Sequence, residues 1–259
     1  MSRFILRQNF LGVVLLFTLG GEVYSQAVAE LPPELAIPET DEGLPGAGLI
    51  LREDWFQEVW NERRGSWQGR EQEDQGALVF LGDSITQGWG EDFHGAFEGA
   101  KLANRGISGD TTRGMLIRME NDVLALNPRG IVMLMGTNDL ANKVPVESIA
   151  GNVKLILEKL KDHDSDMPIV FCLVMPASAK KNRPADKIQE LNRAYSQLVQ
   201  GDPQINVIDT WTLFANADGD AKLEEFPDLL HPNELGYEKW AEALQPVLVK
   251  LGFLENGEQ

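Results

Sequence analysis

The sequence predicts an α/β fold in which helices cover both faces of a parallel sheet. Short, continuous apolar runs alternate along the chain with longer stretches in which apolar residues recur at helical spacing. Runs of the first kind are typical of buried strands, and the alternation indicates strand–helix–strand units with right-handed crossovers. The 259 residues suffice for one α/β domain of ordinary size, and no internal repeat is visible.

Five strands and five long helices are expected from this pattern. The strands are expected over residues 77–81, 101–104, 130–135, 169–174 and 205–208, and the helices over 51–67, 112–126, 145–160, 185–200 and 234–251. In the first helix, Trp55, Val59 and Trp60 recur at helical spacing, so we expect them to pack on the sheet. Residues 178–184 are polar and basic, and we expect them to form a loop at the rim of a site at the strand ends.

The first 27 residues have the pattern of a secretory signal. Arg3 and Arg7 precede an apolar stretch from Phe10 to Leu19, and small and polar residues ending in Ala27 follow. The apolar stretch is too short for a comfortable membrane span. We therefore expect residues 1–27 to be a cleaved signal peptide and the protein to be secreted or periplasmic, without a stable membrane span. An uncleaved anchor is the alternative.

Composition limits the partners and the chemistry. Residues 28–48 contain four prolines and five acidic residues, which predicts an acidic, proline-rich linker before a domain over 49–254. The net charge of −17 argues against nucleic acid and anionic membrane surfaces as partners. The single cysteine, Cys172, excludes an intrachain disulfide and multi-cysteine metal sites, and its apolar neighbours indicate an inert, buried residue.

Four loops carry the residues that suggest chemistry. They read Gly82-Asp83-Ser84, Ser108-Gly109-Asp110, Gly136-Thr137-Asn138-Asp139 and Asp228-Leu229-Leu230-His231. Ligands of parallel sheets bind beyond the carboxyl ends of the strands, and these loops are expected to share that edge. A hydroxyl, a turn of backbone amides, a side-chain amide and an Asp/His pair would then converge. Together they provide a nucleophile, a general base and oxyanion donors, as acyl transfer requires.

Each loop taken alone also has a purely structural interpretation. Asp83 and Ser84 can cap a helix, and Asp228 can cap a turn. Only three histidines are available as a base. His163 lies in a polar connection and His94 in an amphipathic segment, whereas His231 follows Asp228 by three residues. Asp228 can therefore hold the second ring nitrogen of His231 and determine its tautomer.

The four loops, in this order, resemble the blocks of the SGNH (GDSL-type) hydrolases, whose marker residues are Ser, Gly, Asn and His. The similar stretch runs from Phe80 to Tyr237. Its Gly-x-x-Gly-Asp-Thr-Thr form at 106–112 and its Gly-Thr-Asn-Asp form at 136–139 look most like the platelet-activating-factor acetylhydrolase branch.

The resemblance implies a flavodoxin-like, three-layer α/β/α fold with a five-stranded parallel sheet, and neither a metal nor another cofactor. It implies Ser84 as nucleophile, His231 as base and Asp228 as its partner. It also implies an oxyanion hole made by the amides of Ser84 and Gly109 and the side chain of Asn138. We therefore expect a serine esterase that hydrolyses short-chain, mainly acetyl, esters of small molecules or glycans.

Three alternatives remain open. The first is a lysophospholipase, another lipid acyl hydrolase, or an O-acyltransferase of the same fold. The second is a metal-dependent phosphoesterase, and only one histidine would join its ligands, which are Asp83, Asp110, Asp139, Asp228 and His231. The third is a catalytically silent glycan-binding module, against which the intact Ser/Asp/His set argues. The sequence carries no signal for an oligomeric state.

Overall fold

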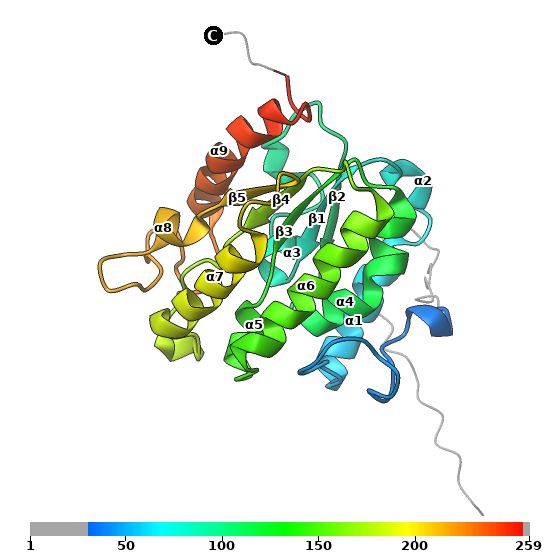
Figure 1. The fold of residues 1–259 in the computed structure, drawn as a ribbon, viewed down its shortest axis with the longest axis horizontal. Coiled ribbons are helices and arrows are strands. Elements are labelled where there is room, and N and C mark those ends of the chain that lie inside the picture. Colours follow the sequence, from blue (N-terminus) through cyan, green and yellow to red (C-terminus); the bar gives the residue numbers. More distant parts are fainter. Residues whose placement is uncertain (1–30, 256–259) are drawn as a thin grey trace, which may run out of the picture. The chain divides into compact units, whose positions relative to one another are not determined.

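Five parallel strands in the order β2-β1-β3-β4-β5 form the sheet of this protein, whose structure is a computed structural model that describes residues 31–255 (Figure 1). The strands are β1 (Leu78–Gly82), β2 (Leu102–Gly106), β3 (Gly130–Leu134), β4 (Ile169–Cys172) and β5 (Ile205–Ile208). All neighbouring strands pair in parallel, so their carboxyl ends share one edge. The expected flavodoxin-like sheet is therefore confirmed. The expected signal segment, residues 1–27, lies outside the described residues.

The long helices lie where the sequence predicts them, within a few residues. They are α1 (Asp54–Trp67), α4 (Thr112–Asp122), α6 (Val146–His163), α7 (Ala185–Val199) and α9 (Glu234–Lys250). Helix α4 is shorter than expected, because the chain leaves helical geometry at Val123 before the 3-10 turn η3 (Leu124–Leu126). The remaining elements are single turns: α2 (Glu71–Asp74), α3 (Ser84–Gln87), α5 (Thr137–Ala141), α8 (Thr210–Phe214), η1 (Pro33–Leu35), η2 (Phe93–Gly95) and η4 (Ala179–Lys181).

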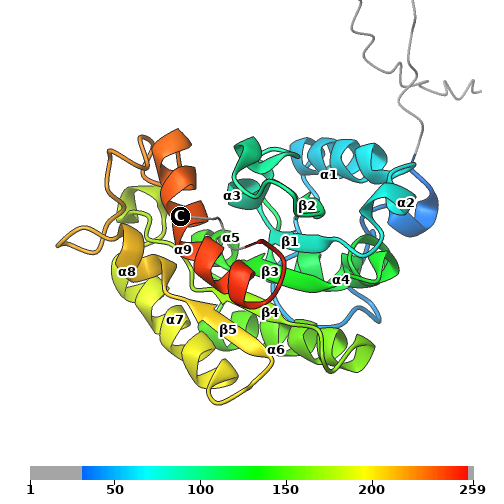
Figure 2. The same cartoon turned by 90° about the horizontal axis from the view of Figure 1, so that it is seen from above.

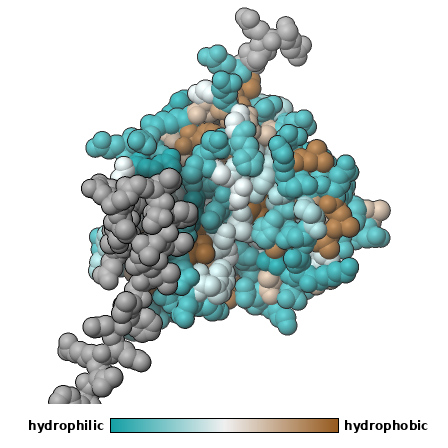
Figure 3. Space-filling model, turned by 180° about the vertical axis from the view of Figure 1, so that it is seen from behind, coloured by the Kyte–Doolittle hydropathy of each residue, from teal (hydrophilic) through white to brown (hydrophobic). Residues whose placement is uncertain are grey.

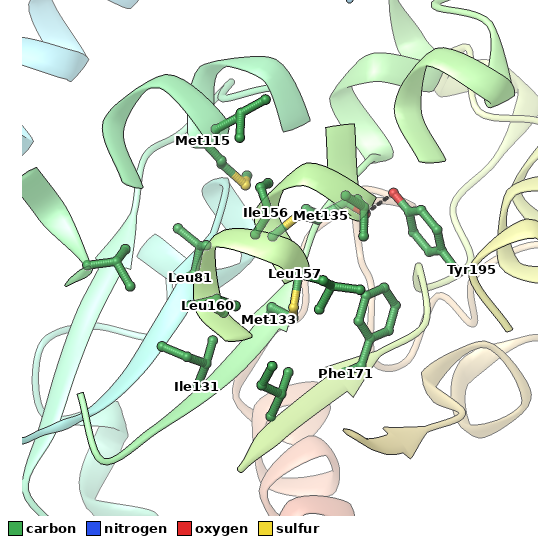
Figure 4. Close-up of a cluster of buried hydrophobic side chains, with 14 of the residues drawn as sticks. Leu81, Met115, Ile131, Met133, Met135, Ile156, Leu157, Leu160, Phe171 and Tyr195 are labelled. Carbon is green, nitrogen blue, oxygen red and sulfur yellow. Dashed lines mark hydrogen bonds between the residues drawn. The ribbon is translucent and has the colours of Figure 1, made fainter. Parts of the chain in front are cut away.

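In the central strands β1, β3 and β4, successive residues enter two different cores, one on each face of the sheet. On one face Leu81, Met133 and Phe171 pack with residues of α4, α6 and α7, and Tyr195 of α7 donates to the carbonyl oxygen of Met135 (Figure 4). On the other face the intervening strand residues pack with Trp89 and with α9. Figure 2 shows α4, α6 and α7 on one side of the sheet and α9 on the other. The predicted three-layer α/β/α arrangement is confirmed.

Helix α1 presents a different face to the protein than the one expected. Phe56, Trp60 and Trp67 are buried and form a third core with Ile107, whereas Trp55 is 50% exposed. The expectation that Trp55 packs on the sheet is therefore wrong. The buried face of α1 begins at Phe56, one residue after Trp55. Because Trp55 and Phe56 are adjacent and both aromatic, the helical period alone does not show which of the two faces the core.

Residues 31–48 do not form the free linker that their composition suggests. They are largely exposed, but they belong to the same compact unit as the sheet. Trp60 donates its indole N–H to the carbonyl oxygen of Leu35, and Asn152 of α6 exchanges two hydrogen bonds with the backbone of Ala47. Arg113 of α4 donates to the carbonyl oxygens of Pro45 and Gly48. Hydrogen bonds from the buried side chains of Trp60, Arg113 and Asn152 thus fix residues 31–48, a segment with few apolar residues, to the domain.

The face that Figure 3 shows is largely hydrophilic, with scattered apolar residues. Across residues 31–255, none of the helices combines the length and the apolar character needed to cross a membrane.

Candidate active site

Ser84 lies at the carboxyl end of β1, on the first turn after the strand. The strand ends at Gly82, and the Asp83 carboxylate caps α3 by accepting a hydrogen bond from the backbone N–H of Ile85 at 3.0 Å. A Cβ atom at position 82 would collide with the side chain of Thr86, so the sharp turn requires glycine there. The structural interpretation of this loop is thus correct for Asp83, which caps the helix, while Ser84 remains partly exposed and accessible to a ligand.

A chain of hydrogen bonds joins Ser84, His231 and Asp228. The Ser84 hydroxyl oxygen lies 3.0 Å from His231 Nε2, and His231 Nδ1 lies 2.9 Å from Asp228 Oδ2. Asp228 Oδ1 accepts the backbone N–H groups of Leu230 and His231 at 3.0 and 2.7 Å. With Nδ1 donating to the carboxylate, Nε2 presents its lone pair to the hydroxyl. This is the arrangement in which an imidazole can take a proton from a serine.

The Asp228 carboxylate is stabilised in its ionised form. Burial acts against the charge, but the backbone N–H and the ring of His231 and the backbone N–H of Leu230 outweigh it and hold the pKa of Asp228 well below its ordinary value. Lys181 adds a further positive charge, with its Nζ 3.5 Å from Asp228 Oδ2. Asp228 is therefore ionised at neutral pH beside His231.

The other two histidines lie away from this chain of hydrogen bonds. His94 is exposed and meets Tyr237 edge to face, with ring centroids 5.7 Å apart. His163 is the exposed last residue of α6. Among the hydrogen bonds of residues 31–255, those of His231 are the only histidine contacts to Ser84.

The loop after β2 lies against the Ser84 turn. A Cβ at Gly106 would collide with the backbone nitrogen of Gln87, and the Gln87 side chain accepts the backbone N–H of Ser108 at 2.6 Å. Gly109 has a φ of +87°, and a Cβ there would lie 2.5 Å from Cη2 of Trp55. The close approach at Gly106 and the positive φ at Gly109 both require glycine. The half-exposed indole of Trp55 therefore lies directly against the loop that contains the Gly109 amide.

Asn138 reaches the same loop from the first turn of α5. Its side-chain Nδ2 donates to the carbonyl oxygen of Asp110 at 3.0 Å, and its side chain is buried. The turn into α5 passes through Gly136, whose φ of +110° lies in the region that favours glycine. The structure thus brings together all the residues expected at the site: Ser84, Gly109, Asn138, Asp228 and His231.

The remaining carboxylates of the strand-end loops have protein partners. Asp110 forms a fully buried ion pair with Arg118, and burial raises the pKa of Asp110 to about 6. Asp139 accepts the backbone N–H and the hydroxyl of Thr112, and burial raises its pKa to about 7. Burial likewise raises the pKa of Asp83 to about 6. These groups brace the loops, and within residues 31–255 no cluster of three or more carboxylate, histidine or cysteine side chains has a metal-binding arrangement.

Two contributors to the site are not among the individual residues that the sequence predicts there. Asn152 of α6 donates to the hydroxyl of Thr112 at 3.0 Å and thereby supports Asp139, the neighbour of Asn138. Arg183, in the loop expected at the rim of the site, donates to the side-chain oxygen of Asn138 at 2.8 Å. Both lie far in sequence from the loops that they support, and isolated polar residues are common in helices and loops.

Comparison with known proteins agrees with the geometry. A model of the GDSL-like Lipase/Acylhydrolase family matches residues 80–239. The chain therefore belongs to the GDSL-like lipase/acylhydrolase family, and it is an ester hydrolase. The expected SGNH (GDSL-type) family is thus confirmed.

The chain is similar in sequence to acetylhydrolase subunits, and its fold is shared with a GDSL-like lipase and an acetylxylan esterase. Platelet-activating factor acetylhydrolase IB subunit alpha1 of Pongo abelii is 28% identical over 184 residues, which are 70% of this chain and 79% of that protein. A GDSL-like lipase from Bacteroides thetaiotaomicron superposes with a TM-score of 0.63 at 22% identity, covering 71% of this chain and 96% of the other. An acetylxylan esterase from Geobacillus stearothermophilus superposes with a TM-score of 0.54 at 19% identity, covering 68% and 94%.

Proposed function

We propose that this protein is a serine esterase in which Ser84 is the nucleophile, His231 the general base and Asp228 the partner of His231. The observation that carries this proposal is the hydrogen-bonded chain from Ser84 Oγ through both ring nitrogens of His231 to Asp228. As Ser84 Oγ attacks the ester carbonyl carbon, its proton passes to Nε2, and Asp228 stabilises the imidazolium that forms.

The tetrahedral intermediate then collapses: the bond between the carbonyl carbon and the alkoxy oxygen breaks, the same imidazolium protonates that oxygen, and the alcohol leaves while the acyl group remains as an ester on Ser84 Oγ. His231, neutral again, takes a proton from water, whose oxygen attacks the acyl carbon. Collapse of the second tetrahedral intermediate releases the acid and returns the proton from His231 to Ser84. The half-exposed His231 and Asp228 side chains leave water free to reach this step.

The backbone N–H groups of Ser84 and Gly109 and the side chain of Asn138 are the proposed oxyanion donors. Ser84 begins α3, so its N–H lacks an acceptor within the helix. Asn138 Nδ2 carries two hydrogens, and the hydrogen bond to Asp110 occupies one of them. The second hydrogen is available for the charge that develops on the carbonyl oxygen in the transition state.

The proposed substrates are short-chain acyl esters, mainly acetates, with acetylated carbohydrates as one class. The curated relatives are named as acetylhydrolases, and the fold is shared with an acetylxylan esterase. A screen of acetyl, butyryl and octanoyl nitrophenyl esters alongside acetylated xylan tests this proposal. Highest kcat/KM for octanoate would favour a lipid acyl hydrolase. Acyl transfer to an added alcohol in preference to water would favour a transferase.

We also propose that the protein is exported through its first 27 residues. The basic, apolar and small-residue segments of that stretch support the proposal. Sequencing the N-terminus of protein recovered from outside the cytoplasm should give a start at residue 28, and an intact Met1 would contradict it.

Asn138→Ala should lower kcat by about 10²- to 10³-fold and change KM little, because an oxyanion donor acts mainly in the transition state. Steady-state kinetics on a nitrophenyl acetate measure both constants. Asn61→Ala, on the exposed face of α1, is the matched control. A raised KM with an unchanged kcat would instead make Asn138 a substrate-binding residue.

Treatment with EDTA should leave kcat unchanged. The carboxylates that a metal-dependent phosphoesterase would need are engaged: Arg118 holds Asp110, Thr112 holds Asp139 and His231 holds Asp228. The measurement is ester hydrolysis before and after dialysis against the chelator. Loss of activity that an added divalent cation restores would support the metal-dependent alternative.

A further inference from the structure

Arg183 contacts the side chain that is proposed to stabilise the oxyanion. Arg183 is buried, with a relative exposure of 8%, in the loop between η4 and α7. One terminal nitrogen donates to Asn138 Oδ1 at 2.8 Å, and Nε donates to the carbonyl and hydroxyl oxygens of Thr137, both at 3.0 Å. We infer that Arg183 is a positioning residue that orients and polarises the Asn138 amide, an inference that rests on the proposed function.

The orientation follows from the chemistry of the two groups. A guanidinium group has five N–H donors and no acceptor, so the atom of Asn138 that faces it must be the carbonyl oxygen. The amide nitrogen must then point to the opposite side, where it donates to the Asp110 carbonyl oxygen in the loop of Gly109. Without Arg183, the single hydrogen bond to the Asp110 carbonyl oxygen would be left to hold the carboxamide, and a rotated carboxamide would present its oxygen to the oxyanion and repel the developing charge.

The charge of Arg183 also strengthens the proposed donor. A cation that donates to an amide oxygen draws electron density from the amide nitrogen, so the N–H groups become better donors. Burial lowers the pKa of Arg183, while the Asp83 and Asp228 carboxylates raise it. The group remains charged, because an arginine loses its proton only far above neutral pH. A neutral side chain of the same size would supply no such polarisation.

The loop is built to hold the guanidinium in place. The backbone N–H of Arg183 donates to the carbonyl oxygen of Ser178 at 3.1 Å, and its Nη1 donates to the carbonyl oxygen of Lys181 at 2.7 Å. Asn182 adopts a φ of +58° to close the turn. Lys181 of the same loop approaches Asp228. One loop therefore contacts both the oxyanion amide and the carboxylate beside His231.

A double-mutant cycle tests whether Arg183 acts through Asn138. Arg183→Met removes the donors and the charge but keeps much of the length. In the wild-type background it should lower kcat about 10- to 100-fold with KM within about twofold. In the Asn138→Ala background the same change should alter kcat by less than about twofold, because the amide that it orients is gone. Arg183→Lys keeps the positive charge but lacks the planar set of N–H donors, so its kcat should lie between those of wild type and Arg183→Met.

The controls separate the possible failures. Arg193→Met removes a positive charge from the exposed face of α7 and should match wild type. If thermal unfolding shows that Arg183→Met is not folded, Arg183→Lys takes its place in the cycle. An equal fall in kcat in both backgrounds, or a change confined to KM, would overturn the positioning role. Wild-type kcat in Asn138→Ala itself would instead remove the proposed oxyanion role of Asn138.

Discussion

Ser84→Ala should lower kcat for ester hydrolysis by about four orders of magnitude or more, while the unfolding temperature changes little. The substitution removes the proposed nucleophile together with its hydrogen bond to His231 Nε2. Ser84 is only partly buried at the start of a single helical turn, so its hydroxyl contributes little to packing. Nitrophenyl acetate turnover and thermal unfolding of the purified variant measure the two effects.

Ser196→Ala is the matched control for that experiment. Ser196 lies on α7, and its hydroxyl donates to the carbonyl oxygen of Asn192, so the variant tests the loss of a helical serine hydroxyl outside the proposed site. It should retain wild-type kcat. Folded Ser84→Ala protein with the wild-type rate would show that Ser84 is not the nucleophile.

Asp228→Asn should lower kcat by about 10⁴-fold, although the side chain keeps its shape. The backbone N–H groups of Leu230 and His231 donate to Oδ1 and would hold an oxygen there, so the new amide nitrogen would face His231 Nδ1. An N–H group in that position favours the tautomer with its hydrogen on Nε2. That tautomer cannot accept the Ser84 proton.

The dependence of stability on pH in the acid range should also change in this variant. Folding lowers the pKa of Asp228 below its ordinary value of 3.8. The ionised carboxylate therefore stabilises the folded state at pH values above 3.8, and this stabilisation is lost as the pH falls below that value. Unfolding temperatures of wild type and Asp228→Asn should therefore converge at low pH. Asp218→Asn, in an exposed turn, controls for the loss of a surface carboxylate. Full activity in Asp228→Asn would contradict the role of Asp228.

The sheet and the proposed catalytic residues could be predicted because their signals are local. Most strands are short apolar runs, and each expected site residue lies within a few residues after a strand or before α9. Parallel pairing then brings Ser84, Gly109 and Asn138 to one edge without further information. Single turns such as α3 and α5 escaped prediction because four or five residues carry no helical period.

The supporting contacts could not be predicted because they join residues distant in sequence. Arg183 and Asn138 are 45 positions apart, and Asn152 and Ala47 are 105 positions apart. Such pairs are determined by how helices and loops pack, which the pattern of one segment does not contain. Trp55 shows the same limit, because its place against Gly109 depends on how α1 packs beside the loop after β2.

The most direct test of the central claim is mass spectrometry of the protein after reaction with a fluorophosphonate. Such a reagent phosphonylates a serine only where a base activates the hydroxyl. The predicted result is one adduct per chain, located by peptide mapping on Ser84, with complete loss of esterase activity and no adduct in Ser84→Ala. An active esterase that acquires no adduct on Ser84, or that is inactivated through another residue, would contradict the account.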